Sequence, residues 1–96
     1  VRPLPYEDGR KSAYWLFSCL VDDKDRFRAF MADKGVMVSA VHSRNDVFSC
    51  FADAKRGPLP GLDYFAEHQM AIPVHWALTE GERVHIVNAI REYERS

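Results

Sequence analysis

The part of this sequence best suited to bind a ligand is a run of five polar residues, His42-Ser43-Arg44-Asn45-Asp46. The run follows an apolar stretch, where a strand is expected to end, and strand ends are where α/β proteins usually meet their substrates. Arg44 offers a planar guanidinium that matches a carboxylate or phosphate, whereas His42 and Asn45 can donate and accept hydrogen bonds. The alternative is a simple turn in which Asn45 and Asp46 satisfy nearby backbone amides. Residue chemistry alone leaves both interpretations open.

Other catalytic and metal-binding patterns receive little support. The glycines form neither a G-x-G-x-x-G nor a P-loop pattern, and G-x-S-x-G, C-x-x-C and H-E-x-x-H are absent. His42, His75 and Asp46 would suit a metal ion if their strand ends converge, but no diagnostic spacing pairs them. A dyad of Cys50 with either histidine needs an exposed thiol, and the apolar neighbours of Cys50 predict burial. We therefore expect no metal site and no self-contained active site.

Composition limits the class of protein and its partners. The chain has 96 residues, of which 47% are hydrophobic and 12% aromatic, as in one small folded domain. Its net charge of -1 lacks the basic excess of a nucleic-acid-binding domain. Cys19 and Cys50 are too few for a disulfide framework and are expected to be buried free thiols in the reducing cytoplasm. The longest apolar stretch, residues 13–21, is shorter than the ~20 residues of a membrane-spanning helix, so no membrane partner is expected.

Hydrophobic periodicity predicts the elements before the polar run. Residues 13–21 are nearly continuously apolar and predict a central strand. Asp22-Asp23 supplies an N-cap for a helix that Gly35 ends. Residues 36–41 alternate and predict a second strand. The apolar stripe of the helix consists of Phe27, Phe30, Met31 and the stem of Lys34.

The elements after the polar run are a short helical turn, a short helix, a strand and a long helix. Asn45 or Asp46 is expected to cap the turn, and residues 55–61 break all regularity. The short helix passes through residues 64–66. The third strand covers residues 70–75, where Pro73 indicates an edge strand or a strand end. The turn carries Val47, Phe48 and Phe51.

The last helix has the clearest signals. Thr79 and Glu82 form a T-x-x-E capping box at its start, and it is expected to run to about Glu94. Its predicted buried stripe consists of Val84, Ile86, Val87, Ile90 and Tyr93.

These elements predict an α+β fold, that is, a two-layer α/β sandwich in the order β-α-β-α-α-β-α. The sheet is expected to be small, three-stranded and mainly antiparallel or mixed, with the helices packed on one face. Residues 1–12, with Pro3 and Pro5, are interpreted as a linker, and residues 13–96 as the domain. Because the chain starts at Val1 rather than at methionine, we expect it to be a piece of a longer polypeptide.

Several short motifs occur in order from about Ser12 to Tyr93. They are Ser12-Ala13-Tyr14-Trp15-Leu16-Phe17, Asp25-Arg26-Phe27, Lys34-Gly35-Val36, His42-Ser43-Arg44-Asn45-Asp46, Leu59-Pro60-Gly61-Leu62-Asp63, Ile72-Pro73-Val74-His75 and Leu78-Thr79. Each motif is weak alone, but the ordered set resembles the C-terminal small domain of the DegT/StrS group of pyridoxal-phosphate-dependent sugar aminotransferases, with fold type I. The run from His42 to Asp46 is similar to that family's H-x-R-N-D loop.

The resemblance implies a cytoplasmic homodimer that carries pyridoxal phosphate on an upstream large domain. Such an enzyme transfers an amino group from an amino acid, expected to be glutamate, to a keto nucleotide-sugar. None of the four lysines (Lys11, Lys24, Lys34 and Lys55) matches the Schiff-base lysine, which is expected upstream of Val1. This piece alone is therefore expected to bind no cofactor and to be inactive.

The resemblance also implies a role for the polar run. The small domain would close the substrate cleft, with His42, Arg44, Asn45 and Asp46 facing the substrate and Arg44 contacting its anion. The alternative is a standalone small α/β ligand- or protein-binding module without catalytic activity. A domain separated from a covalent partner should expose apolar side chains along Tyr14, Tyr64 or Trp76, and a natural monomer should not.

Overall fold

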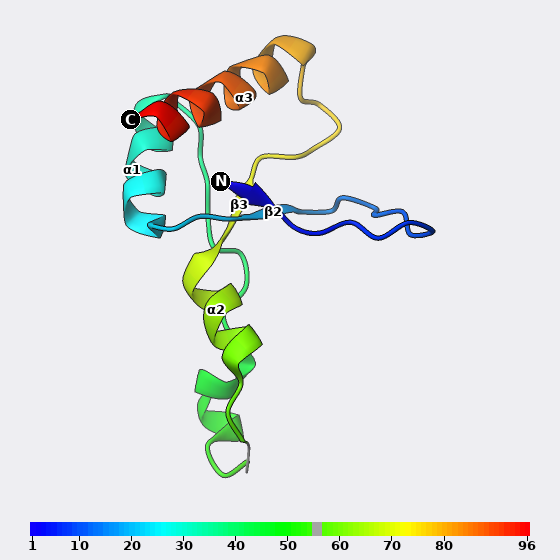
Figure 1. Ribbon diagram of the computed structural model, residues 1–96, viewed down its shortest axis with the longest axis vertical. Helices are drawn as coiled ribbons and strands as arrows, with labels where there is room; N and C mark the ends of the chain where they lie inside the picture. The colour runs from blue at the N-terminus through cyan, green and yellow to red at the C-terminus, as the bar shows by residue number, and fades with distance from the viewer. Residues whose placement is uncertain (55–56) are drawn as a thin grey trace.

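The computed structural model describes residues 1–54 and 57–96, which form a small antiparallel sheet and three α-helices (Figure 1). The strands are β1 (Arg2–Pro3), β2 (Phe17–Leu20) and β3 (Gln69–Ile72), in the spatial order β1-β2-β3. Both pairings are antiparallel, and Cys19 of β2 lies opposite Met70 of β3. The predicted α+β class with a small antiparallel sheet is confirmed.

The central strand is shorter than predicted. β2 lies in the middle of the sheet, as its apolar sequence predicts, but it begins at Phe17 rather than at residue 13. The chain turns away before it, and Tyr14 has a φ of 48°, which places this residue in the sparsely populated left-handed region. Arg2 and Pro3 pair with the other edge of β2. The first residues of the segment interpreted as a linker therefore belong to the sheet.

Residues 36–41 do not form the predicted second strand. Only Ser39 pairs with the sheet: the amides of Ser39 and Ala71 each donate to the other residue's carbonyl, at 3.2 and 2.8 Å. The alternation is present nevertheless, because Val36 and Val38 are buried and Met37 is exposed. β3 ends at Ile72 and is therefore shorter than the predicted strand over residues 70–75. The next residue, Pro73, has no amide hydrogen to extend a ladder and marks the strand end, one of its two predicted roles.

Two helices have the predicted ends. In α1 (Lys24–Asp33), the carboxylate of Asp23 accepts from the amide of Arg26 at 2.9 Å, and Gly35 follows the helix with a φ of 76°. In α3 (Glu80–Arg95), Thr79 and Glu82 form the predicted capping box. Both helices therefore begin where short-range capping chemistry places them.

The hydrophobic core lies between the sheet, α1 and α3. Phe27 and Met31 of α1 are fully buried, and the ring of Tyr93 in α3 meets Phe27 edge-on at a centroid distance of 5.0 Å. Cys19 is also buried, as predicted, and burial raises the pKa of its thiol. None of the described helices has the length and apolar content needed to cross a membrane.

The buried face of α3 differs from the predicted stripe. Val84 and Val87 are exposed, whereas Ile86, Ala89 and Tyr93 are buried. The buried side is therefore rotated relative to the predicted stripe, because the side that carries Ile86, Ala89 and Tyr93 faces the core that α3 shares with α1 and the sheet.

This difference gives a test of the helix orientation. We expect Ile86→Ala to lower the free energy of unfolding by about 2–4 kcal/mol, because it leaves a cavity in the core. The neighbouring Val87→Ala should change it by less than about 0.5 kcal/mol, because that side chain faces outward. Urea denaturation of the intact protein that carries this chain measures both values. Equal losses for the two variants would contradict the assigned face.

The remaining elements extend away from the core as a lobe. It comprises two 3-10 turns, η1 (Asn45–Val47) and η2 (Ser49–Phe51), and the start of α2 (Pro60–His68) (Figure 1). We call residues 44–54 and 57–63 the distal lobe. The predicted turn and the helix through residues 64–66 are confirmed. Of the predicted break at 55–61, residues 55 and 56 lie outside the described residues.

The prediction that Cys50 is buried is wrong. Cys50 is exposed, and so are its apolar neighbours Val47, Phe48 and Phe51. The cause is the position of the two 3-10 turns, which project beyond the core instead of packing against it (Figure 1). The radius of gyration, 15.6 Å, exceeds the roughly 12.5 Å of a compact chain of this length for the same reason.

Candidate functional site

Arg44 is held by two carboxylates. Its Nε and Nη2 donate to the two carboxylate oxygens of Asp46 at 2.6 and 2.7 Å, and its Nη1 donates to Oδ1 of Asp63 at 2.6 Å. The side chain of Asp46 is only 11% exposed, whereas that of Asp63 is 61% exposed. Because charge-assisted bidentate pairs fix geometry as well as charge, the guanidinium has one defined orientation.

This arrangement sets the electrostatics of the loop. Hydrogen bonding to Asp46, and secondly to Asp63, raises the pKa of Arg44 above its ordinary value. The guanidinium is therefore a permanent cation, but two carboxylates already neutralise it. These bonds use three of the five N–H donors of Arg44, so a substrate anion would compete with two carboxylates for its charge, and Asp63 is the more accessible of the two. The expected role of Arg44 as an anion contact stays a prediction.

Arg44 and the two carboxylates that it binds, Asp46 and Asp63, form a unit that we call the clamp. The clamp joins two of the motifs that carry the family resemblance. Arg44 belongs to the H-x-R-N-D motif and has an extended backbone just before η1. Asp63 ends the Leu59–Asp63 motif and lies in the first turn of α2, whose first residue is Pro60. Two segments that are separate in the sequence therefore meet through one arginine.

His42 and Asn45 lie beside this clamp and face outward. Both side chains are exposed. The backbone carbonyl of His42 accepts a hydrogen bond from Nε2 of the buried Gln69 at 3.2 Å. The imidazole ring of His42 meets the ring of Trp15 edge-on, with a centroid distance of 6.3 Å. The carbonyl of Asn45 accepts from the amide of Phe48 at 3.1 Å.

The predicted side-chain cap of this turn is wrong. Neither Asn45 nor Asp46 caps it: the N-cap of η1 is Arg44, which makes no side-chain capping bond. The carboxylate of Asp46 instead accepts both bonds of the Arg44 fork.

Three residues of this site were not identified from the sequence: Asp63, Gln69 and Trp15. Asp63 is the last residue of the Leu59–Asp63 motif, but nothing in the sequence marked it as a partner of Arg44. The one other feature that could have drawn attention to it is its place in the first turn of a helix, where acidic residues are favoured. Gln69 is a polar residue at the start of a strand, which predicts exposure rather than the observed burial. Trp15 belongs to the apolar run that predicted a strand, but it lies in the turn before β2 and is 77% exposed.

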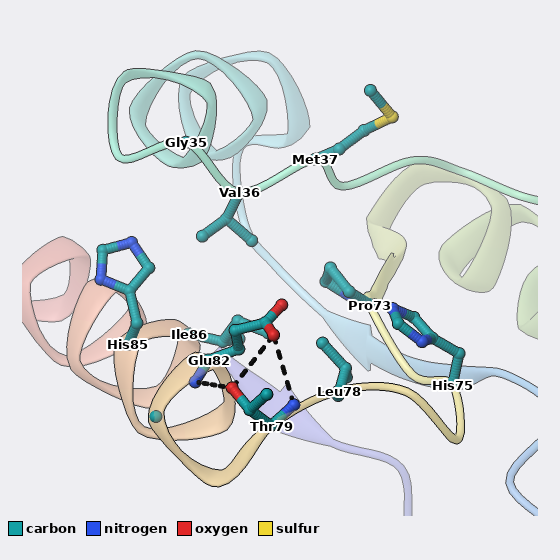
Figure 2. Close-up of a pocket in the computed structure, with 11 residues that line it drawn as sticks. Gly35, Val36, Met37, Pro73, His75, Leu78, Thr79, Glu82, His85 and Ile86 are labelled. Atoms are coloured by element: carbon teal, nitrogen blue, oxygen red, sulfur yellow. Dashed lines mark hydrogen bonds between the residues drawn. The ribbon is translucent and has the colours of Figure 1, made fainter.

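A second candidate site is the cavity of about 490 Å³ shown in Figure 2. Its walls come from the residues after α1, the residues after β3 and the first turns of α3. Three of the polar side chains that line it are already engaged. Thr79 and Glu82 bond to each other, and Nε2 of His85 lies 2.7 Å from the carbonyl oxygen of Lys34. The cavity therefore offers shape but few free polar groups, and the loop is the better candidate.

The described residues do not fit the binding site of a Schiff-base cofactor. Nζ of Lys24 donates to the carbonyl of Ala66 at 3.0 Å, and Nζ of Lys34 pairs with Glu92 at 2.5 Å. Lys11 lies in the exposed segment before β2, and Lys55 is outside the described residues. Within residues 1–54 and 57–96, no group of three His, Cys, Asp or Glu side chains is arranged to hold a metal ion. No cofactor step is therefore assigned to this chain.

The exposed aromatic side chains agree with those expected for a domain separated from a larger protein. Tyr14 is 46% exposed, Tyr64 47% and Trp76 97%. Apolar side chains that are exposed singly also occur on monomers, so the separation of this domain from a larger protein stays a prediction.

Comparison with known proteins finds similar chains among solved structures. No protein-family model matches the chain, and no curated protein matches it. Among solved structures, it is similar to the sugar aminotransferase CalS13 from Micromonospora echinospora, with 40% identity and a TM-score of 0.87. It is also similar to AtS13 from Actinomadura melliaura, with 36% identity and a TM-score of 0.86. Each match covers 95% of this chain and 24% of the other.

A more distant structure shares the fold. A DegT DnrJ EryC1 StrS aminotransferase from Brucella abortus matches 96% of this chain and 26% of its own length, with a TM-score of 0.86 at 18% identity. The chain thus spans about a quarter of the length of the structures that it matches. The last of these structures, at 18% identity, shows the shared fold alone. On the likenesses at 40% and 36% identity and on its ordered motifs, the chain belongs to the DegT/StrS group of sugar aminotransferases.

Proposed function

We propose that this chain is the C-terminal domain of a pyridoxal-phosphate-dependent enzyme that transfers an amino group from glutamate to a keto nucleotide-sugar. The observation that carries the proposal is the likeness to a sugar aminotransferase, at 40% identity and a TM-score of 0.87 over 95% of the chain. Pyridoxal phosphate, bound on an upstream domain, would supply the electron sink for the transfer, while the protein orients the reactants.

In this proposal the loop of residues 42–46 lines one side of the substrate cleft. Arg44 acts through its clamp: it holds the loop against α2 by its bonds to Asp46 and Asp63. The exposed side chains of His42 and Asn45 are then placed to hydrogen-bond a polar substrate such as a sugar. The domain therefore contributes orientation and closure, and the proposed active form is a cytoplasmic homodimer.

The test uses the natural full-length gene product. We expect a protein several times heavier than 11.1 kDa that binds pyridoxal phosphate, seen by visible absorbance. We also expect it to transfer ¹⁵N from labelled glutamate to a keto nucleotide-sugar, followed by mass spectrometry. A parallel reaction without glutamate controls for incorporation from other sources. A product of about the size of this chain, without the cofactor, would contradict the proposal and favour the standalone binding module.

A further inference from the structure

We infer that Gln69 is a positioning residue, whose buried side-chain amide holds His42 at the point where the loop of residues 42–46 leaves the sheet. The inference deepens the proposed function and rests on it, because His42 is a group that contacts the sugar only in that proposal. Gln69 is the first residue of β3 and is 2% exposed. A buried strand residue is ordinarily apolar, because a buried amide loses its hydrogen bonds to water. A glutamine at this position therefore needs a polar partner.

That partner is the backbone carbonyl of His42. Nε2 of Gln69 donates to it at 3.2 Å, across 27 positions of the chain. The bond stands in place of a missing part of the sheet. Ser39 and Ala71 form an isolated antiparallel bridge. A ladder that continued from this bridge would place Val41 opposite Gln69, but the described residues show no such continuation. The glutamine side chain therefore spans the gap that the departing chain leaves.

Gln69 makes this bond from the side of β3 that faces away from the core cluster. Its neighbour Met70 is fully buried in that cluster, and successive side chains of a strand point to opposite faces of the sheet. An apolar residue of similar length should therefore be accepted in place of Gln69. It would bury no amide, and the carbonyl of His42, an exposed residue, could bond to water instead.

The bond fixes one end of the loop, and the clamp fixes the other. Arg44 lies two residues after His42 and binds Asp63 on α2. With its carbonyl held, His42 has a defined backbone position, from which its ring meets Trp15 edge-on. A displacement of roughly 1 Å at a group that contacts substrate can cost up to about a hundredfold in rate. The loss of the Gln69 bond should therefore be seen in the use of the sugar.

Gln69→Met in the full-length enzyme tests the inference, because methionine is about as long as glutamine and has no N–H to donate. We expect the KM for the keto sugar to rise about tenfold and kcat to change by less than about twofold. The midpoint of urea denaturation should stay the same or rise. A merely structural role would instead lower the midpoint and leave this KM unchanged. Gln69→Leu is the second variant if Gln69→Met does not fold.

A double-mutant cycle measures whether Gln69 acts through His42. His42→Ala alone should raise the KM for the sugar, and the addition of Gln69→Met should then raise it by less than about twofold more. The matched control is Met70→Leu, which lies on the same strand but faces the core. It conserves volume and should leave the KM for the sugar unchanged.

Hydrogen exchange gives a measurement that needs no activity. The amide of Ser39 donates to the carbonyl of Ala71 at 3.2 Å, and the bond from Gln69 supports the chain just beyond this bridge. In Gln69→Met, the peptide that contains Ser39 and His42 should exchange at least about threefold faster, because the bridge opens more readily. Peptides from α3 should exchange at the wild-type rate.

The outcomes separate this inference from the proposed function. An unchanged KM in Gln69→Met, an effect of full size in the His42→Ala background or an equal effect of Met70→Leu would overturn the inference. If the wild-type protein transfers no amino group to a keto nucleotide-sugar, the proposed function fails, whereas faster exchange in Gln69→Met would still support the anchor at His42. An active enzyme in which Gln69→Met changes neither the exchange nor the KM would keep the proposed function and overturn the inference.

Discussion

Replacing Arg44 with alanine in the full-length enzyme should lower kcat/KM for the keto sugar by about ten- to a hundredfold, since a loop displaced by roughly 1 Å costs about that much. The substitution removes three charge-assisted hydrogen bonds at once, two to Asp46 and one to Asp63. His42 and Asn45 would then lose the fixed loop that places them. Steady-state kinetics with saturating glutamate and varied sugar measure the change, and we expect most of it in the KM for the sugar.

Asp63→Asn separates the two roles open to Arg44. If Arg44 positions the loop, removing the Asp63 charge should weaken the clamp and raise the KM for the sugar in the same direction as Arg44→Ala. If Arg44 instead binds the substrate anion directly, Asp63→Asn should free the guanidinium and lower that KM. Arg44→Lys is the matched control for charge: it keeps the cation but loses the bidentate fork. Unchanged kinetics in Arg44→Ala would contradict both roles.

Local signals predicted the fold well wherever the structure depends on nearby residues. The capping box of Thr79 and Glu82, the cap at Asp23 and the stop at Gly35 all lie where the sequence placed them. Elements whose limits depend on distant pairing were less accurate. Residues 36–41 have the alternation of a strand, but strand assignment requires a partner, and the sheet offers only Ala71.

Burial was harder to predict than helix formation, for a related reason. The apolar residues Val84 and Val87 fit a helical stripe, yet which side of α3 faces the core depends on α1 and the sheet. Phe48 and Phe51 are exposed because the two 3-10 turns that carry them project beyond the core formed by the described residues (Figure 1). An apolar residue predicts burial somewhere in the complete protein, and a sequence does not say which polypeptide segment buries it.

The role of residues 42–46 as a site stays a prediction, and the contacts within this loop were not predicted from the sequence. The polar run at His42–Asp46 was identified from residue types alone. Its pairing with Asp63 was not, because an ion pair across a long sequence separation follows from the path of the intervening chain. The two motifs are separate in the sequence, and the structure shows that Arg44 connects them.

Phe27→Ala should lower the free energy of unfolding by about 3–5 kcal/mol, which is the largest stability change that we expect in this domain. Phe27 is fully buried, and its ring packs edge-on against Tyr93. Tyr93 also contacts Phe30 edge-on at 5.5 Å and lies 4.7 Å beneath the guanidinium carbon of Arg26. Removing the Phe27 ring would leave a cavity where α1 meets α3. Urea denaturation of the intact protein measures the loss.

Two further variants identify the cause of that loss. Phe27→Leu retains most of the buried volume and should cost less than about 1.5 kcal/mol, whereas Val84→Ala, on the exposed side of α3, should cost less than about 0.5 kcal/mol. Below its unfolding transition, Phe27→Ala should keep the KM for the sugar, because the core lies apart from the loop. Arg44→Ala should do the opposite and change KM with little loss of stability. If Phe27→Ala alone raised the KM for the sugar, the position of the loop would depend on packing in the core. The bonds of Arg44 to Asp46 and Asp63 would then not be enough to position His42 and Asn45.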